Sequence, residues 1–281
     1  MNSSLPVIAA IPNYNMGEQL NELLPSLLSS GYDEVYVLDD GSIDDSREIT
    51  QSISSDIHFV SGKENKGAGA NRNRVLSVLG HEATIHFLDA DITLETDRSA
   101  EVVAEAIPKE PFGFLGGLAL TQDGIQSVWN YGPRQSLWSD AGAVVQNYLE
   151  SMLTSNPEKA SDLREKFSVL LRDWPNPLAE PVRRPVFWAI EQNLVVNSKT
   201  LSELGGFDES LREHEIQDLA IRMAHRGLKR YFDPSFVTTH KEVEVRNYNR
   251  RLEMLKAEYS IARKHGFKQW LKPDGILIPK L

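Results

Sequence analysis

The sequence contains no cysteine among its 281 residues. Disulfides, zinc–thiolate sites and thiol catalysis are therefore excluded, and the composition fits a reducing compartment. No apolar run reaches the roughly 20 residues that a transmembrane helix needs. The segment from Met1 to Pro6 lacks a basic stretch followed by an apolar one, so we expect no signal peptide. These absences predict a cytoplasmic protein.

The chain also lacks an excess of basic charge. It has 30 Lys and Arg residues and 40 Asp and Glu residues, which gives a net charge of -10. We therefore expect no nucleic-acid partner bound through a basic surface. An anionic small substrate stays compatible with this charge, because binding one needs a local cation or a metal ion. Hydrophobic residues make up 41% of the chain, enough for the core of one large domain.

Strand and helix patterns alternate through the N-terminal part. Short apolar runs predict buried strands, and each of the first three is followed by a helical pattern. The strands are expected at Val7–Ile11, Glu34–Leu38, Ile57–Ser61 and Thr84–Leu88. This alternation predicts an α/β fold: an open, mostly parallel twisted sheet with right-handed crossovers and helices on both faces.

Polar loops follow all four strands, at Pro12–Asn15, Asp39–Ser42, Asn65–Asn73 and Asp89–Asp91. Ligands of open α/β sheets bind beyond the carboxyl ends of the strands. The four loops are therefore expected to converge on one crevice.

Asp89 and Asp91 end the fourth strand with two carboxylates two positions apart. Two carboxylates are costly to bury unpaired. Beyond the strand they can converge on one hard divalent cation, which prefers oxygen ligands and would bind a diphosphate. The alternative is that both residues begin a loop and cap the next helix.

The alternation stops after an expected helix capped by Asp97 and an expected strand at Phe112–Leu120. Residues 121–185 look like an insertion, with predicted helices at Ala141–Leu153 and Glu158–Leu171. Strand and helix patterns then resume. We expect a strand at Val186–Val196, a short helix capped by Ser198, a helix at Glu215–His225, one or two short strands within Tyr231–Thr239 before His240, and an amphipathic helix at Tyr248–His265.

Several motifs in this chain carry one resemblance. They are Ala9–Asn15, Val37–Asp44, Asn65-Lys66-Gly67 with Arg72-Asn73, Asp89-Ala90-Asp91, Leu204–Glu209, and Glu215–Leu219 with Arg222. In this order they resemble the family-2-type glycosyltransferases of the GT-A fold. The resemblance covers residues 5–120 and 186–245 and assigns no motif to residues 121–185.

The resemblance implies a single GT-A domain over residues 1–281. Residues 1–120 would form a nucleotide-binding half, 121–185 a helical insertion, 186–245 an acceptor and catalytic half, and 246–281 a C-terminal helix and tail. It also implies a nucleotide-diphosphate sugar as donor. A UDP-type donor is favoured, with dTDP and GDP as alternatives.

The resemblance further implies which residues hold the donor. Asp40 would hydrogen-bond the base, Gly67 would allow close backbone approach, and Arg72 would contact phosphate with two hydrogen bonds. Pro12 and Tyr14 would lie beside the base.

For the metal, the resemblance implies Mn²⁺ or Mg²⁺ bound by Asp89, Asp91 and His240 together with the diphosphate. Imidazole favours Mn²⁺ of the two. Arg246 and Arg250 follow closely in the chain and could close over the diphosphate.

Glu215 and Asp218 lie three positions apart, so they share a helix face, and either could be a general base toward an acceptor hydroxyl. Inverting relatives commonly place their base where this chain has Ile216, which cannot take a proton. We therefore expect an inverting enzyme with Glu215 as base. Asp218 and Glu213 are alternative bases. A retaining enzyme and a non-catalytic nucleotide-sugar-binding homologue are alternative functions.

The acceptor is expected to be a saccharide or a glycolipid. Glu191, Asn193 and Trp188 could contact the donor sugar or the acceptor, because they precede the turn at Leu204–Glu209. The helix Tyr248–His265 has a basic face. That face could meet the inner side of a membrane or a lipid-linked acceptor, a partner helix, or solvent.

Overall fold

The computed structural model describes residues 5–243, 245 and 248–271. All four strands predicted in its N-terminal part are confirmed. This part consists of β1 (Val7–Asn13), α1 (Gly17–Ser29), β2 (Glu34–Asp39), α2 (Ser46–Ile53), β3 (Ile57–Ser61), α3 (Ala68–Val78) and β4 (Thr84–Leu88).

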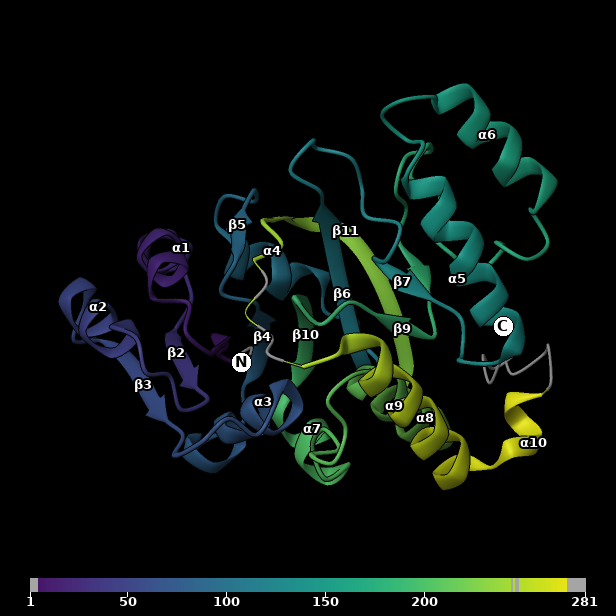
Figure 1. Ribbon diagram of the computed structural model, residues 1–281. Coiled ribbons are helices and arrows are strands. Elements are labelled where there is room, and N and C mark those ends of the chain that lie inside the picture. Colours follow the sequence, from purple (N-terminus) through teal and green to yellow (C-terminus); the bar gives the residue numbers. More distant parts are fainter. Residues whose placement is uncertain (1–4, 244, 246–247, 272–281) are drawn as a thin grey trace.

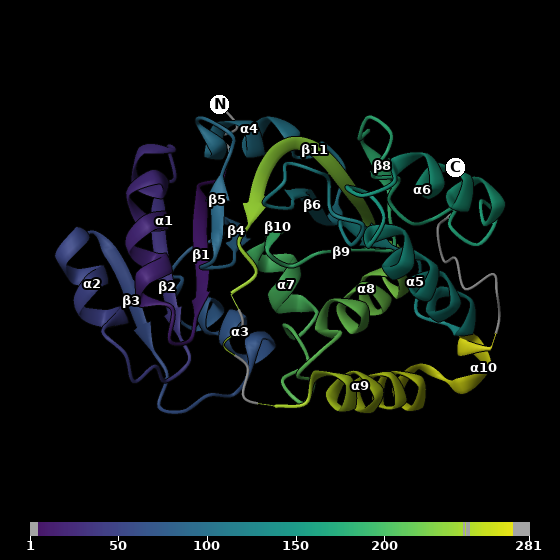
Figure 2. The same ribbon diagram turned by 45° about the horizontal axis from the view of Figure 1, so that its top comes forward.

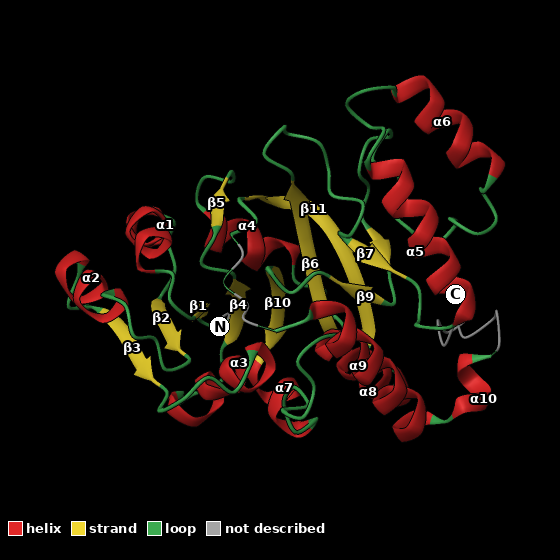
Figure 3. Cartoon of the chain, in the orientation of Figure 1, coloured by secondary structure: helices red, strands yellow, loops and turns green. Residues whose placement is uncertain are grey.

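The remaining elements complete the sheet and add a helical insertion (Figures 1 and 3). They are β5 (Ile92–Leu94), α4 (Ser99–Ala106), β6 (Phe112–Leu120), β7 (Tyr131–Gly132), α5 (Leu137–Glu150), α6 (Pro157–Lys166), β8 (Arg184–Pro185), β9 (Trp188–Ala189), β10 (Asn193–Asn197), α7 (Ser198–Glu203), α8 (Glu215–His225), β11 (Lys229–His240), α9 (Arg250–His265) and α10 (Phe267–Trp270).

The main sheet has the strand order β3-β2-β1-β4-β10-β6-β11-β5, with β8 also paired to β11. β1 is parallel to β2 and β4, and β2 is parallel to β3, as predicted. β10 runs antiparallel to both of its neighbours, and β11 is parallel to β6. The sheet is therefore mostly parallel, with β10, β5 and β8 reversed. The N-terminal alternation gave no sign of this reversal.

The continuous apolar run of β1 is explained by burial on both faces of the sheet. Ile8 and Ala10 pack in a cluster that includes residues of α3, α8 and α9. Ala9 and Ile11 point the other way and pack against the buried leucines of α1. Successive residues of a strand face opposite sides, so one strand supplies both layers of the core.

The insertion has a small core of its own. Val128, Leu149, Leu171 and Trp174 belong to one buried cluster, separate from the clusters of the main sheet. Helix α5 begins earlier than predicted, because Ser136 caps it in a reciprocal capping box with Ser139. Figures 1 and 2 both place α5, α9 and α10 at the end of the molecule away from α1 and α2.

Five local predictions were wrong. The single strand expected at Val186–Val196 is broken into β9 and β10, which pair with different partners. The short strands expected within Tyr231–Thr239 are one strand of 12 residues, β11, and the helix expected at Glu158–Leu171 ends at Lys166. The cap of α7 is Asn197, whose side chain accepts a hydrogen bond from the Thr200 amide, rather than Ser198. Arg98, rather than Asp97, occupies the cap position of α4, and it makes no side-chain cap hydrogen bond.

Three polar side chains form a row of hydrogen bonds within the core. The imidazole of His86 lies 2.8 Å from the Tyr32 hydroxyl and 2.7 Å from Asn193 Oδ1. Asn193 also donates to the carbonyls of Leu118 and Phe236 and is 0% exposed. The structure therefore contradicts a substrate contact for Asn193. Burial lowers the pKa of His86 to about 4.

This lowered pKa predicts a pH-dependent loss of stability. Unfolded histidine titrates near pH 6.5, so below that pH the unfolded chain binds a proton that folded His86 does not. We expect His86 to remove roughly 2 kcal/mol of unfolding free energy between pH 7 and pH 4.5. In urea titrations, His86→Gln should lose less stability over this interval than the wild type. The control His81→Gln, at a surface position, should lose as much stability over this interval as the wild type. If His86→Gln also loses as much as the wild type, the assignment is contradicted.

Candidate active site

The loops after β1, β2 and β4 meet at one edge of the sheet, as the sequence predicted. Asn13 Nδ2 donates to Asp39 Oδ1 at 3.0 Å, which joins the ends of β1 and β2. Asn71 on α3 donates to the Leu38 carbonyl at 2.6 Å. Asn71 stands where the family resemblance leads one to expect alanine, and its amide links α3 to the end of β2.

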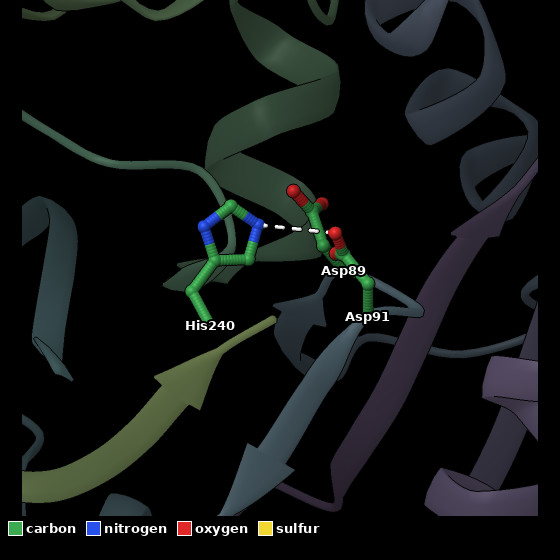
Figure 4. A group of neighbouring side chains, drawn as sticks. All are labelled: Asp89, Asp91 and His240. Atoms are coloured by element: carbon green, nitrogen blue, oxygen red, sulfur yellow. Dashed lines mark ion pairs between the residues drawn. The ribbon is translucent and has the colours of Figure 1, made fainter. Parts of the chain in front are cut away.

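Asp89, Asp91 and His240 form a group that could hold a metal ion (Figure 4). One ligand atom from each of the three lies within 4.8 Å of the others. Asp89 and Asp91 come from the segment between β4 and β5, and His240 is the last residue of β11. The pairing of β5 with β11 brings the two segments together, with His240 opposite Ile92.

In this group, His240 Nε2 lies 3.2 Å from Asp91 Oδ2. Burial disfavours the charged imidazole, but the hydrogen bond to Asp91 and its negative charge outweigh burial and raise the pKa of His240. Burial also opposes the ionised form of Asp91, yet His240 and the Val243 amide hold the pKa of Asp91 below its usual value. A bound metal would take the place of the imidazole proton. Two carboxylates and one imidazole suit Mn²⁺.

Arg72 is a buried cation next to this group. Its guanidinium lies 2.9 Å from Asp89 Oδ1, and its side chain is only 5% exposed. Nε of Arg72 is buried without a hydrogen-bond partner among the described residues. Arg72 thus binds Asp89, and its contact with a phosphate stays a prediction.

Glu215, the first residue of α8, has a buried carboxylate oxygen without a described partner. Burial, followed by the negative charge of Glu191, raises the pKa of Glu215 to about 7 despite the opposing charge of Arg72. Glu191 itself accepts a hydrogen bond from the Ile216 amide at 3.2 Å, at the start of α8. The structure therefore brings Glu191 and Glu215 together beside Arg72, and a proton acceptor active near neutral pH can occupy this place.

The other predicted catalytic carboxylate has a different environment. Asp218 is fully buried and lies within 2.8 Å of Arg222, Lys264 and His265. These partners depress its pKa strongly, against the effect of burial. Its contacts therefore favour a structural role, joining α8 to α9. Ile216 is buried in the main hydrophobic cluster, which explains an apolar residue at that position.

The residues predicted to surround the base of the nucleotide lie near one another, but their contacts within the protein differ. The Asp40 carboxylate accepts from the amides of Lys66 and Gly67 at 2.9 and 2.8 Å and pairs with Arg74 at 2.8 Å. Asp40 therefore organises the loop before α3, and its contact with a base stays a prediction. Pro12 and Tyr14 are half-buried at the end of β1. Gly67 has a φ of 96°, in the region that favours glycine.

The turn before α8 is held by a residue that the sequence did not single out for this role. Asn73 accepts from the Phe207 amide at 2.8 Å and donates to its carbonyl at 2.9 Å. Gly206 has a φ of 74°, and a Cβ there would lie 2.4 Å from the Asn73 side chain. The turn Leu204–Glu209 therefore packs tightly against α3 through Asn73.

Two further predictions can be placed. Trp188 lies against Gly132 and makes an edge-on contact with Trp174, so it packs within the insertion. Arg250 lies 3.4 Å from Glu213, and Arg246 lies outside the described residues. A role for Arg250 over a diphosphate stays a prediction.

Comparison with known families decides the family. The model of glycosyl transferase family 2 matches residues 8–155, which is more than half of the chain. The chain belongs to this family. Asp40, Arg72, Asp89 and Asp91 all lie within the matched residues, whereas His240 and Glu215 lie beyond them. No curated protein matches this family 2 member in sequence.

Solved structures confirm the GT-A fold. The mannosyltransferase PcManGT from Pyrobaculum calidifontis, in complex with GDP-Man and Mn²⁺, has a TM-score of 0.59 at 18% identity over 94% of this chain. GalNAc-T7 with UDP, GalNAc and Mn²⁺ has a TM-score of 0.63 at 14% identity over 94% of this chain. TarS 1-349 of S. aureus, in complex with UDP-GlcNAc, gives 0.59 at 17% identity over 92%. The chain spans 66%, 48% and 66% of those three chains, respectively.

The Asp218 ion pairs predict a large effect on stability. Asp218→Asn leaves Arg222, Lys264 and His265 without their shared anion, and we expect a loss of about 3–5 kcal/mol in unfolding free energy at pH 7. The control Glu253→Gln breaks the Lys256 pair on the outer part of α9 and should cost less than about 1 kcal/mol. Urea denaturation compares the two. Equal, small losses would show that the cluster does not join α8 to α9.

Proposed function

We propose that this protein transfers a sugar from a nucleotide-diphosphate sugar to a hydroxyl group of a saccharide or glycolipid acceptor, with metal assistance and inversion. The observation that carries the proposal is the position of Arg72. It lies between the group Asp89–Asp91–His240 and the acidic pair Glu191–Glu215. The proposed phosphate-binding and proton-accepting groups therefore lie next to each other in a member of glycosyl transferase family 2.

On the donor side, Asp89, Asp91 and His240 would hold Mn²⁺ or Mg²⁺. When bound, such an ion neutralises the departing diphosphate as a Lewis acid. Arg72 supplies a second positive charge next to Asp89, and we propose that its guanidinium contacts a phosphate oxygen of the donor. Two of the solved structures that share the fold contain Mn²⁺, and their nucleotides are GDP-Man and UDP. We propose a UDP-type donor, with GDP as the alternative base.

On the acceptor side, Glu215 accepts the proton of the acceptor hydroxyl. The acceptor oxygen forms a bond to the anomeric carbon while the bond from that carbon to the diphosphate oxygen breaks, and the electron pair leaves with the diphosphate. The pKa of about 7 suits this role, because the carboxylate is ionised near neutral pH and still basic enough to accept a proton. Residues 1–120 would bind the nucleotide, 186–245 would carry the base, and the insertion 121–185 would border the acceptor.

The metal assignment predicts metal-dependent nucleotide binding. Calorimetry with UDP and with GDP should show at least about tenfold tighter binding in Mn²⁺ than in EDTA. Asp91→Asn should abolish this difference, because it removes the more buried carboxylate ligand. The matched control Asp97→Asn changes an exposed aspartate close in the chain and should leave the difference intact. Equal binding with and without metal would contradict the assignment.

The base assignment predicts both a loss of rate and a pH profile. Glu215→Gln should lower kcat about 10²–10⁴-fold without weakening nucleotide binding. In the wild type, kcat/KM should rise with pH through about 7, as Glu215 loses its proton.

Glu191→Gln provides the internal check on this profile. Removing the negative charge of Glu191 lowers the pKa of Glu215, so the midpoint should move to lower pH while activity remains. A rate that Glu215→Gln leaves unchanged, or a midpoint that Glu191→Gln does not move, would contradict the assignment of Glu215 as base.

A further inference from the structure

Helix α5 exposes a stripe of apolar residues to solvent. Leu137, Ala141, Val144 and Tyr148 recur at helical spacing, and three of them are 47%, 69% and 55% exposed (Leu137, Val144 and Tyr148). Trp138, beside the stripe, is 54% exposed. The opposite face of α5 includes Leu149, which is buried in the core of the insertion. The residues of the stripe therefore do not contribute to the core of the insertion.

Helix α9 has a second stripe of this kind. Leu252, Leu255 and Tyr259 lie on its outer face and are 50%, 63% and 60% exposed. Its inner face places Ala257 and Ile261 in the main core. Phe267 in α10 and Leu271 just after it continue the apolar character, at 49% and 58% exposed.

The two helices are neighbours. Gln135, just before α5, hydrogen-bonds Glu258 of α9, and Asp140 of α5 acts electrostatically on the same glutamate. Figures 1 and 2 both show α5, α9 and α10 in the half of the molecule away from α1 and α2, with α9 leading along the lower side to α10. We call the exposed apolar residues of α5, α9, α10 and Leu271 the apolar end surface. Large apolar side chains exposed together on neighbouring helices of a folded protein indicate an interaction site.

The charge around this surface indicates the partner. Residues 250–271 contain six Lys and Arg residues and two Glu residues, although the whole chain carries a net charge of -10. Arg251, Lys256, Arg263 and Lys268 are all exposed. A second copy packed on the same surface would bring these like charges together. An anionic lipid surface would instead attract them and accept the apolar side chains.

The residue types also suit a bilayer interface. Trp138, Tyr148 and Tyr259 each combine an apolar ring with a polar group, and such residues gather at the boundary between lipid and water. No helix among the described residues is long and apolar enough to cross a membrane. A helix with exposed apolar and basic residues on one side lies in the plane of the interface. We propose that the apolar end surface binds an anionic lipid bilayer.

This binding would place the crevice close to the lipid. Helix α9 is joined to α8, which begins at Glu215, through the ion pairs of Lys264 and His265 with Asp218. At the other end of α5, Glu150 is close enough to Glu242, two residues after His240, for their charges to interact. The acceptor class this implies is a lipid-linked saccharide, and that step rests on the proposed transferase function.

Sedimentation with vesicles tests the surface without donor, metal or acceptor, so its failure is distinct from failure of the transferase proposal. We expect the full chain to bind vesicles made of an equal mixture of phosphatidylcholine and phosphatidylglycerol. Its binding to vesicles of pure phosphatidylcholine should be at least about tenfold weaker. Added salt should weaken the binding. The double variant Leu255→Ser and Tyr259→Ser should reduce it at least about tenfold.

The matched control is the double variant Ile43→Ser and Val169→Ser, which changes residues that are 92% and 90% exposed outside the apolar end surface. This control should bind vesicles as the wild type does. Circular dichroism and urea denaturation check that both variants are folded. Arg251→Gln with Arg263→Gln provides a second test that leaves the apolar residues in place, and it should weaken binding to anionic vesicles only.

Three results would overturn the proposal: equal binding to neutral and anionic vesicles, vesicle binding that the α9 variants leave unchanged, or no vesicle binding. In the last case, light scattering would show whether the chain forms a dimer that Leu255→Ser and Tyr259→Ser dissociate, which would make the surface an interface between copies. Vesicle binding that depends on the apolar end surface, together with no metal-dependent nucleotide binding, would support the surface and contradict the transferase function.

Discussion

The interaction on which the candidate active site depends is the pair of the buried Arg72 and the half-buried Asp89. One guanidinium, almost without solvent, interacts with three carboxylates on separate elements: Asp89 after β4, Glu191 before β10 and Glu215 at the start of α8. The negative charge exceeds the positive charge, and burial adds to this effect, so the pKa values of both Glu191 and Glu215 are raised. A cation bound at Asp89 would shift this balance. The proposed donor and acceptor halves of the reaction are therefore coupled through Arg72.

A second set of contacts keeps these elements in register. Asn73 fixes the turn at Phe207 to α3. Glu191 accepts a hydrogen bond from the Ile216 amide at the start of α8, where the cap residue His214 makes no side-chain cap hydrogen bond. Asp218 pairs with Arg222 on its own helix and joins α8 to α9 through Lys264 and His265. The carboxylate that could have served as a base is thus used to hold the helix that presents Glu215.

Much of this arrangement could be predicted from the sequence. The strands could be predicted because apolar runs buried on both faces leave a strong signal. Asp89 and Asp91 could be singled out because they directly follow such a strand, whereas His240 was added to the metal group only by the family resemblance. The reversed strand β10 and its break from β8 and β9 could not be predicted, since pairing partners are set by tertiary contacts. The environments of Asn193 and Asp218 could not be predicted either, because they depend on residues distant in the sequence. Asn193 is buried and hydrogen-bonded to His86, and Asp218 contacts Lys264 and His265.

The central claim is that a metal ion bound by Asp89, Asp91 and His240 holds the diphosphate of the donor. Anomalous X-ray diffraction from crystals grown with Mn²⁺ and UDP, or with Mn²⁺ and GDP, tests it most directly. The account predicts one manganese peak in contact with Asp91 and His240, with diphosphate oxygens on its open side toward Arg72. A nucleotide bound in the crevice with no manganese peak at these residues would contradict it.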